Sequence, residues 1–256
     1  MNRSLCMALM LAWSFAAGAV QVHADGAVAH AGSLELNDGA RLSDAALAAQ
    51  PLPQAYMLGA AWLRPGLAIE QQRLKAGVLF DLASLEHQAR VDGHDDLAAT
   101  TGALHQWIRS LPVTGRRAPA LLDPRVVEVD APHNHLLAAG DRLYYPLRPT
   151  TIHVVGAVRQ PCTLPLVPLK AARLYLASCP GSKAADPDQI YVIEPDGRVF
   201  VQNIALWNRG APRVLAPGAL IYVPLREHAA SRVDATLNGD IAAFLATQVL
   251  PGPGVK

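Results

Sequence analysis

The residue types in this chain that could bind a metal ion are gathered in two polar segments. Residues 130–135 contain Asp130, His133 and His135, and residues 94–96 contain one histidine and two aspartates. Imidazole and carboxylate groups at such spacings can serve as ligands for zinc and other divalent metals. Polar loops flanked by proline collect the same residues without a metal, and Asp95 can instead cap a helix. We therefore expect no metal site at either segment.

Motifs for catalysis and cofactor binding do not occur in the sequence. It has no Gly-x-Ser-x-Gly, no His-Glu-x-x-His, no phosphate-binding loop and no dinucleotide fingerprint. Two carboxylates of the kind that cleave a glycosidic bond would have to converge from separate segments, and nothing in the sequence selects such a pair. The expectation is a non-catalytic protein without a cofactor. An enzyme that acts through converging carboxylates is the alternative.

Arg116 is the first choice for a binding residue. It lies in Thr114-Gly-Arg-Arg117, at an expected boundary between secondary-structure elements. A guanidinium at such a boundary can meet an acidic sugar or a carboxylate. The alternative is structural, with the planar fork of the side chain satisfying loop carbonyls and one buried acid.

Exposed aromatic rings are the other candidates, because a flat ring stacks on the apolar face of a sugar. The residues chosen for this role are Trp62, Tyr145 and Trp207. Trp207 could instead anchor the last crossover of the chain. The aromatic residues expected in the core are Trp107, Tyr144 and Tyr222.

Two cysteines, Cys162 and Cys179, remain if the amino-terminal segment is removed. An oxidising compartment would permit them to form a disulfide that joins a helix to a sheet. Two separate buried thiols are the alternative. A catalytic role is not expected, because no histidine lies beside either cysteine in the sequence.

The amino terminus predicts a secretory signal peptide at residues 1–24. Arg3 precedes an uncharged run from residue 4 to residue 22, which ends at the small-residue site Val22-His-Ala24. Cleavage there would make Asp25 the first residue. A retained membrane anchor is the alternative, but the strongly apolar stretch is short for a span. The mature protein is therefore expected to have no direct membrane span.

The overall composition describes a folded protein with balanced charge. Hydrophobic residues make up 51% of the chain, which excludes wholesale disorder. The 22 basic residues nearly cancel the 21 acidic residues. This balance gives no reason to expect nucleic acid or an anionic membrane surface as a partner.

A repeated segment indicates two tandem domains of one fold. Residues 137–148 and 215–226 are identical at seven of twelve positions, and each runs from a glycine turn into an apolar stretch closed by Pro-Leu-Arg. Each copy reads as the final strand of a small sheet, with proline at its edge. The spacing suits duplicated small domains better than a solenoid.

The first domain is expected to carry a helical insertion. Residues 33–36 with the turn Asn37-Asp-Gly39 suggest a hairpin, and Ser43 can cap a short helix at 44–49. Apolar residues then recur every three to four positions in 69–90 and again in 95–111, which predicts a helical hairpin at about 67–111. A strand is expected at 126–129.

The second domain lacks such an insertion. A strand is expected at 151–157, its hairpin partner at 164–167, a helix at 169–177, a second hairpin at 190–193 and 199–201, and a closing strand at 220–224. A small sheet wrapped on one helix is a β-grasp-like α+β arrangement.

A carboxy-terminal amphipathic helix is expected at residues 231–250. Its apolar stripe is formed by Val233, Leu237, Ile241, Phe244 and Leu245. The stripe could dock onto a partner helix or a channel wall. The alternative, which we favour, is that it packs on its own domain. Binding to a membrane surface is not expected, because the polar face is not basic.

Several segments give the chain a family resemblance. Residues 140–149 and 154–158 resemble the β-grasp ligand-binding domains of bacterial polysaccharide-export proteins. The chain is also similar to the GfcC family of periplasmic capsule-biosynthesis proteins, in residues 41–44, 111–116, 122–124, 196–197, 207–208 and 237–238.

The resemblance implies an α+β fold with two tandem β-grasp (SLBB-like) domains. The expected division is a signal peptide at 1–24, a first domain at 25–148 with its helical insertion, a second domain at 149–228 and a terminal helix and tail at 229–256. The implied role is accessory, in capsule or exopolysaccharide biosynthesis, assembly or export. Its partners would be the polysaccharide or the outer-membrane export channel. A periplasmic polysaccharide-modifying enzyme and a ring-forming structural oligomer are the alternatives.

Overall fold

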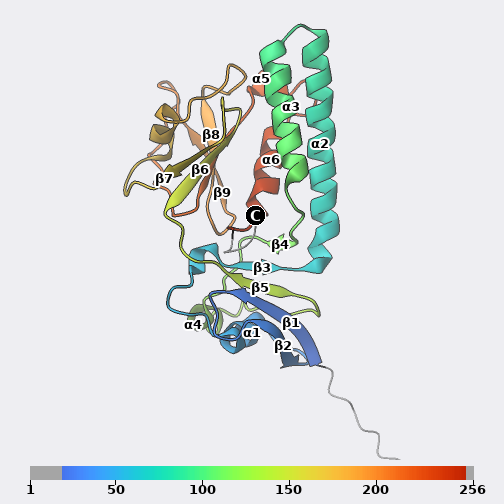
Figure 1. The fold of residues 1–256 in the computed structure, drawn as a ribbon, viewed down its shortest axis with the longest axis vertical. Helices are drawn as coiled ribbons and strands as arrows, with labels where there is room; N and C mark the ends of the chain where they lie inside the picture. Colours follow the sequence, from blue (N-terminus) through green and yellow to red (C-terminus); the bar gives the residue numbers. More distant parts are fainter. Residues whose placement is uncertain (1–18, 252–256) are drawn as a thin grey trace, which may run out of the picture.

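A computed structural model describes residues 19–251 as an α+β fold with two five-stranded sheets (Figure 1). The first sheet lies at one end of the molecule, and the second sheet lies beside a long helical hairpin at the other. Part of the predicted signal peptide, residues 1–18, falls outside the described residues. Within residues 19–251, no helix combines the length and the apolar character needed to cross a membrane.

The first sheet has the strand order β2-β1-β5-β3-β4. Its strands are β1 (Ala19–Gly26), β2 (Gly32–Asn37), β3 (Ala61–Leu63), β4 (Arg116–Arg117) and β5 (Arg142–Tyr145). The central pair, β1 and β5, is parallel, and the other neighbours are antiparallel. Short helices complete this domain: α1 (Leu42–Ala49), η1 (Met57–Gly59), η2 (Pro65–Leu67) and α4 (Pro124–Val127).

The second sheet repeats this topology in the order β7-β6-β10-β8-β9. Its strands are β6 (Thr151–Gly156), β7 (Cys162–Pro165), β8 (Gln189–Ile193), β9 (Val199–Asn203) and β10 (Leu220–Val223), with the 3-10 helix η3 (Ala172–Ala177) after β7. The parallel pair is again the central one, β6 and β10. The repeated closing strands are therefore confirmed as equivalent elements, β5 and β10.

A glycine ends the first strand of each domain for the same steric reason. Gly26 and Gly156 both have positive φ, and each is followed by Ala-Val. A Cβ atom would lie 2.1 Å from the carbonyl oxygen of Tyr145 in the first case and 2.3 Å from that of Val223 in the second. A Cβ atom cannot fit at such distances, so both positions require glycine. The repeated Gly-Ala-Val therefore marks where the first strand of each domain passes close to the closing strand.

The helical hairpin is confirmed, with α2 at Ala68–Val91 and α3 at Asp95–Ser110. It is inserted between β3 and β4, where the second domain has only a tight turn between β8 and β9. Its apolar residues do not pack on the sheet that it interrupts. Val78, Leu82, Leu85, Leu104 and Ile108 join one core with the second sheet.

The first domain has a separate and smaller core. It lies between the first sheet and α1, and its largest fully buried side chains include Trp62, Tyr145 and Leu42. Val22 and Ala24 of β1 also belong to this core. The hairpin therefore belongs to the first domain by sequence and to the second by packing.

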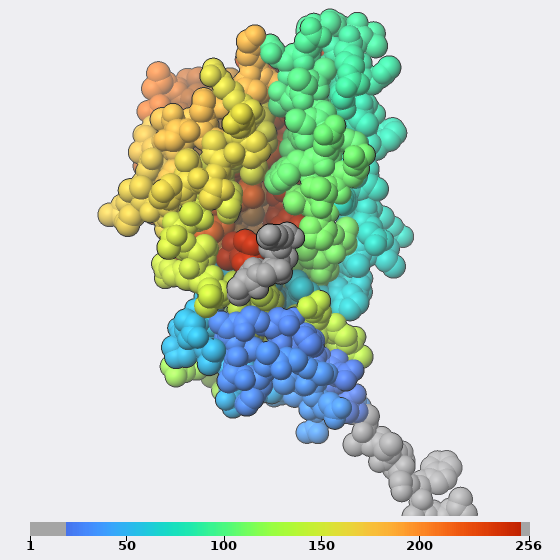
Figure 2. Space-filling view, in the orientation of Figure 1, coloured from blue at the N-terminus to red at the C-terminus, as the bar shows by residue number. Residues whose placement is uncertain are grey.

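The carboxy-terminal segment folds as α5 (Glu227–Ala230) and α6 (Leu237–Ala246) instead of one long helix over residues 231–250. Helix α6 lies between α2 and the second sheet. Figure 2 shows α6, in red, deep between the second domain and the hairpin. Because α6 is covered on several sides, apolar residues occur around much of its surface, and a single amphipathic stripe does not describe it.

Three local predictions are corrected. Strand β2 pairs with the upstream strand β1, so the turn at 37–39 leads into α1 instead of closing a hairpin. Residues 124–127 form α4, because the side chain of Asp123 accepts a hydrogen bond from the backbone N–H of Arg125 and Pro124 begins the helix. Helix α1 begins at Leu42 after the N-cap Arg41, so Ser43 is not its cap.

The amino-terminal boundary of the first domain also differs from the expected residue 25. Strand β1 begins at Ala19 and pairs with both β2 and β5. Cleavage after Ala24 would remove Val22 and Ala24 from the core. Residues 20–24, which that cleavage would remove, therefore belong to the folded first domain.

Candidate functional site

Arg116 lies on β4, at the point where the chain leaves the helical hairpin, and its side chain is only 5% exposed. The guanidinium donates hydrogen bonds to three backbone carbonyls. Nη1 donates to Gln248 at 2.7 Å and to Ala246 at 3.4 Å, and Nη2 donates to Pro195. Arg116 therefore connects the hairpin exit to the tail after α6 and to the β8–β9 turn.

The backbone around Arg116 is held by side chains on both sides. Gln71 of α2 donates from Nε2 to the carbonyl of Arg116 at 2.9 Å, and its Oε1 accepts from the N–H of Gly115 at 2.8 Å. The hydroxyl of Thr114 donates to the carbonyl of Thr247 at 2.7 Å. These contacts fix the guanidinium at the meeting point of the two domains and the hairpin.

The electrostatic environment of Arg116 fits a structural fork. Burial lowers the pKa of Arg116 to about 10, and the charge of Asp196 opposes this shift. The ion pair that Asp196 forms is with Arg198, whose Nε donates to Asp196 Oδ2 at 2.6 Å, and the hydrogen bonds of Arg116 go to backbone carbonyls. The Nε atom of Arg116 has no partner within residues 19–251. That atom is itself buried, so it offers no exposed donor to a ligand.

A cleft of about 580 Å³ adjoins Arg116. It lies between the start of the hairpin and the loop at residues 132–135, and its polar lining includes Glu70, Arg117, His133 and His135. His133 Nδ1 lies 2.8 Å from Asp130 Oδ2. The ring of His135 stacks on Trp62, and burial, followed by the charge of Arg117, lowers the pKa of His135. No group of three potential metal ligands forms within the described part of the chain.

Two of the three aromatic candidates are wrong as exposed sugar-binding rings. Trp62 is buried, and its Nε1 donates to Asp141 Oδ2 at 3.0 Å. Tyr145 is buried, and its hydroxyl donates to the carbonyl of Leu122 at 3.1 Å. Both point into the first core, while Tyr144, the expected core residue, is half-buried on the opposite face of β5.

Trp207 is the one candidate ring that the structure exposes, at 78%. Its Nε1 donates to Asp188 Oδ1 at 3.2 Å, and Asn208 donates to the carbonyl of Asp188 at 3.2 Å. The neighbouring Leu206 is also exposed. The ring is therefore held by one edge and presents its faces to solvent.

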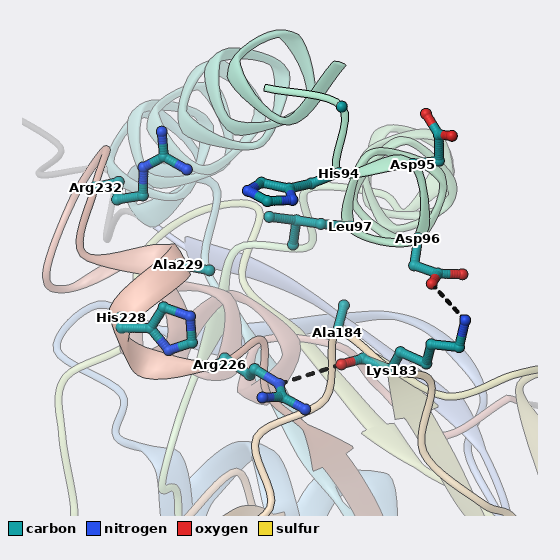
Figure 3. Close-up of a pocket in the computed structure, with 11 residues that line it drawn as sticks. His94, Asp95, Asp96, Leu97, Lys183, Ala184, Arg226, His228, Ala229 and Arg232 are labelled. Atoms are coloured by element: carbon teal, nitrogen blue, oxygen red, sulfur yellow. Dashed lines mark hydrogen bonds and ion pairs between the residues drawn. The ribbon is translucent and has the colours of Figure 1, made fainter. Parts of the chain in front are cut away.

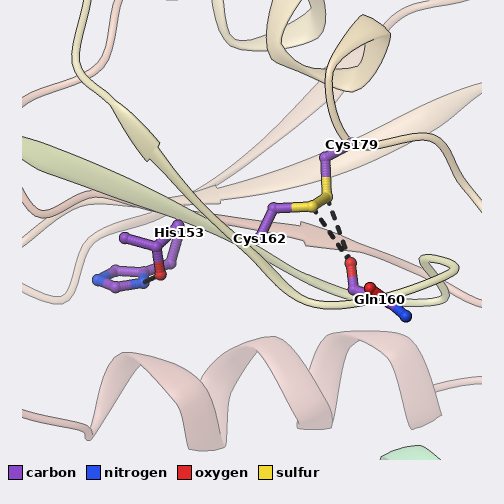
Figure 4. The surroundings of a disulfide bond; sticks show 5 residues. His153, Gln160, Cys162 and Cys179 are labelled. Carbon is purple, nitrogen blue, oxygen red and sulfur yellow. Dashed lines mark hydrogen bonds between the residues drawn. A yellow bond between two sulfur atoms is a disulfide. The ribbon is translucent and has the colours of Figure 1, made fainter.

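The structure joins Cys162 and Cys179 in a disulfide (Figure 4). Cys162 is the first residue of β7, and Cys179 is the second residue after η3. The bridge therefore joins a helix to the sheet, as one of the two alternatives predicted. Both sulfur atoms lie near the carbonyl oxygen of Gln160, at 3.2 and 3.5 Å. The bridge is structural, because it ties an edge strand to the helix that covers the sheet.

The predicted docking stripe is buried inside the molecule. Leu237, Ile241, Phe244 and Leu245 belong to the second core, and Val233 packs against it. Asn238 on the same helix accepts from the hydroxyl of Tyr222 at 3.1 Å and donates to the carbonyl of Leu225 at 2.8 Å. Partner docking through this stripe is therefore corrected to packing on the chain's own domain, because the inserted hairpin covers it.

A pair of carboxylates that sequence reasoning did not select lies in another cleft. Glu194 and Asp196, on either side of Pro195, line a cleft of about 370 Å³ together with Arg198, Phe200 and Arg213. Burial raises the pKa of Glu194. In the sequence these residues lie in the turn of the hairpin expected at 190–201, and residues 196–197 also belong to the family resemblance.

These features define a class of protein built from two copies of one α+β topology, which are held together by an inserted hairpin and a buried arginine. The family follows from comparison with known proteins. The family model for capsule biosynthesis GfcC, N-terminal, matches residues 16–148, and that for capsule biosynthesis GfcC, C-terminal, matches residues 160–250. The chain therefore belongs to the GfcC capsule-biosynthesis family.

A curated relative is similar along nearly the whole chain. The uncharacterized protein YjbG of Escherichia coli (strain K12) is 32% identical over 240 residues, which cover 93% of this chain and 92% of the relative. The similarity thus extends over both domains and the inserted hairpin.

Proposed function

We propose that this protein is a non-catalytic periplasmic accessory protein in capsule or exopolysaccharide biosynthesis, assembly or export. It acts by binding the polysaccharide or the outer-membrane polysaccharide-export channel. The observation that carries this proposal is the match of both capsule-biosynthesis family models, which together include the two domains.

The strand arrangement supports the proposed domain type. In each half a parallel central pair is flanked by antiparallel strands, and a helix or 3-10 helix follows the second strand. This is the arrangement that we infer to be a β-grasp (SLBB-like) domain. Export to the periplasm through a cleavable amino-terminal signal peptide is part of the same proposal, and the disulfide suits an oxidising compartment.

Trp207 is the proposed contact with the polysaccharide. Its exposed ring is fixed by Asp188, so stacking on a sugar would cost little conformational entropy. The carboxylate of Asp188 beside the ring offers acceptors for sugar hydroxyls. Arg116 contributes by holding the two domains in one orientation. It also lines the cleft of about 580 Å³, where it is the second proposed point of contact.

The experiment for the proposed function is deletion of the gene, with polysaccharide quantified at the cell surface, in the medium and inside the cell. Surface polymer is expected to fall while internal polymer persists or accumulates. Complementation with Trp207→Ala is expected to restore less surface polymer than complementation with Tyr144→Phe, a ring-preserving control. If deletion leaves the amount of polysaccharide unchanged at the surface, in the medium and inside the cell, the proposal is wrong.

One observation favours a second function, that of a periplasmic polysaccharide-modifying enzyme. Glu194 and Asp196 line one cleft, and the raised pKa of Glu194 suits a group that donates a proton. Under this alternative, complementation with Glu194→Gln would restore the amount of polymer but change its chain length or substitution. If polymer from the Glu194→Gln strain has the same chain length and substitution as wild-type polymer, the enzyme alternative is wrong.

A further inference from the structure

We propose that the cleft at the tip of the helical hairpin binds carboxylate-bearing sugars, so that an acidic segment of a polysaccharide is held between the hairpin and the second domain. This inference rests on the proposed function for the nature of the ligand. The cleft has a volume of about 630 Å³ and is formed by three segments that are distant in sequence (Figure 3). They are the hairpin turn at 93–97, the loop at 183–184 and residues 226–232.

Positive charge reaches the cleft from two of these segments. Lys183 comes from the loop after the disulfide, and Arg226 and Arg232 flank α5. His94 and His228 add two imidazole rings to the lining. Leu97, Ala184 and Ala229 are the apolar members, and they lie between the charged groups in Figure 3. An apolar surface beside cations suits a sugar ring that carries a carboxylate.

The acidic residues nearby do not neutralise every cation. Asp96 pairs with Lys183 at 2.9 Å, and Asp92 pairs with Arg232 at 2.5 Å. The carboxylate of Asp95 points away from Arg226 in Figure 3. Within residues 19–251, Arg226 has no carboxylate within ion-pair distance. It is therefore the cation with its charge still available.

Arg226 is also held in place for binding. Its Nε donates to the carbonyl oxygen of Lys183 at 3.1 Å, which fixes the direction of the side chain. The two terminal nitrogens remain as a planar fork, and such a fork matches the two oxygens of a carboxylate. The entropy cost of ordering the side chain is thus partly met before a ligand arrives.

The repeat supplies a matched control. Arg148 ends the first copy of the repeated segment, as Arg226 ends the second. The guanidinium of Arg148 instead lies 5.5 Å from the ring centroid of Tyr56 and lines none of the tip cleft. A change at Arg148 therefore removes the same type of exposed cation from the protein and leaves the cleft intact.

The test is isothermal titration calorimetry of the mature protein with trigalacturonate as the probe and maltotriose as its neutral counterpart. Trigalacturonate is expected to bind and maltotriose to bind much more weakly or not at all. Arg226→Gln is expected to weaken trigalacturonate binding by about tenfold or more, because a charge-assisted hydrogen bond is lost. Arg226→Lys should lose less, and Arg148→Gln should bind like wild type. Added salt should weaken binding to wild type.

Three results would overturn the inference: absence of binding to trigalacturonate, equal binding by Arg226→Gln, or equal binding of maltotriose. Thermal unfolding of each variant checks that the fold is retained, and Lys183→Gln provides a second variant in the cleft. Failure in this assay leaves the gene-deletion result untouched. A fall in surface polymer without trigalacturonate binding would reject the tip cleft and retain the accessory function.

Discussion

The two halves of this protein share one strand order but differ in what covers their sheets. Tyr144 and Tyr222 occupy equivalent positions of the repeat, yet Tyr144 is half-buried and Tyr222 is fully buried. Leu147 is 50% exposed, whereas its equivalent Leu225 is 0% exposed. The difference arises because α6 and the hairpin inserted in the first half pack on the second half. Equivalence in a repeat therefore predicts backbone position and leaves burial undetermined.

The largest expected effect concerns the first strand of the first half. A protein that begins at Asp25 lacks most of β1, which pairs with both β2 and β5 and contributes Val22 and Ala24 to the core. We expect it to lose about 5 kcal/mol or more, the whole stability of a small domain. Urea unfolding followed by circular dichroism compares it with a protein that begins at Val20.

The cleavage site used during the proposed export is an independent test of where the first domain begins. Ala17-Gly-Ala19 is a small-residue site of the kind used for signal cleavage. Under the proposed export, amino-terminal sequencing of the exported protein is expected to find an end at or before Val20. An end at Asp25 would contradict the role of β1 in the mature fold.

The second prediction tests the repeated tyrosines directly. Tyr222→Ala is expected to lower the free energy of unfolding by about 3 to 5 kcal/mol, because a large buried side chain is replaced by a cavity. Tyr144→Ala should cost less, about 1 kcal/mol, because Tyr144 is only partly buried. Urea titration of both variants measures the difference. Equal losses would show that the two halves are covered to the same extent.

The third prediction concerns the arginine between the halves. Arg116→Gln removes donors to the carbonyls of Pro195, Ala246 and Gln248, so we expect a loss of about 2 to 3 kcal/mol. Hydrogen exchange should quicken in the tail at 247–250. Arg117→Gln, one residue further on, is the control and should leave exchange in the tail unchanged. If hydrogen exchange in the tail is equal in both variants, Arg116 does not hold the tail in place.

The smallest effect is a pH dependence in the second half. Burial lowers the pKa of His153 below its ordinary value, so the unfolded chain binds a proton more readily than the folded protein. This contribution to stability is present above the ordinary histidine pKa of about 6.5 and is lost as pH falls toward the lowered value. Titration of His153 by NMR should give a pKa below that of a histidine peptide, and a value at or above the peptide's would contradict the burial.

Much of the fold followed from local patterns that the structure confirms. The spacing of apolar residues located both hairpin helices, and the glycine turns with Pro-Leu-Arg located both closing strands. Alternation also implied that Tyr144 and Tyr145 face opposite ways. It did not say which face is the core, because that depends on α1, which covers one side of the first sheet. The assignment of the two tyrosines was therefore inverted.

The errors have similar physical causes. Residues 126–129 are rich in valine and suggest a strand, but Asp123 and Pro124 start a helix before them. Trp62 lies on a strand of three residues, which is too short to show a pattern. The apolar stripe at 233–245 was correctly recognised as a contact surface. Its partner was an insertion more than a hundred residues upstream, which no local pattern identifies.

The inserted hairpin also determines when this protein can finish folding. A chain made from its amino end produces α2 and α3 well before the second sheet, and α6 comes almost last. The core that these helices share with the second sheet is complete only when residues near 246 are available. Synthesis therefore passes through a long interval in which an exposed apolar surface invites aggregation. A premature stop close to the carboxyl end would leave nearly the whole chain made and its main core open.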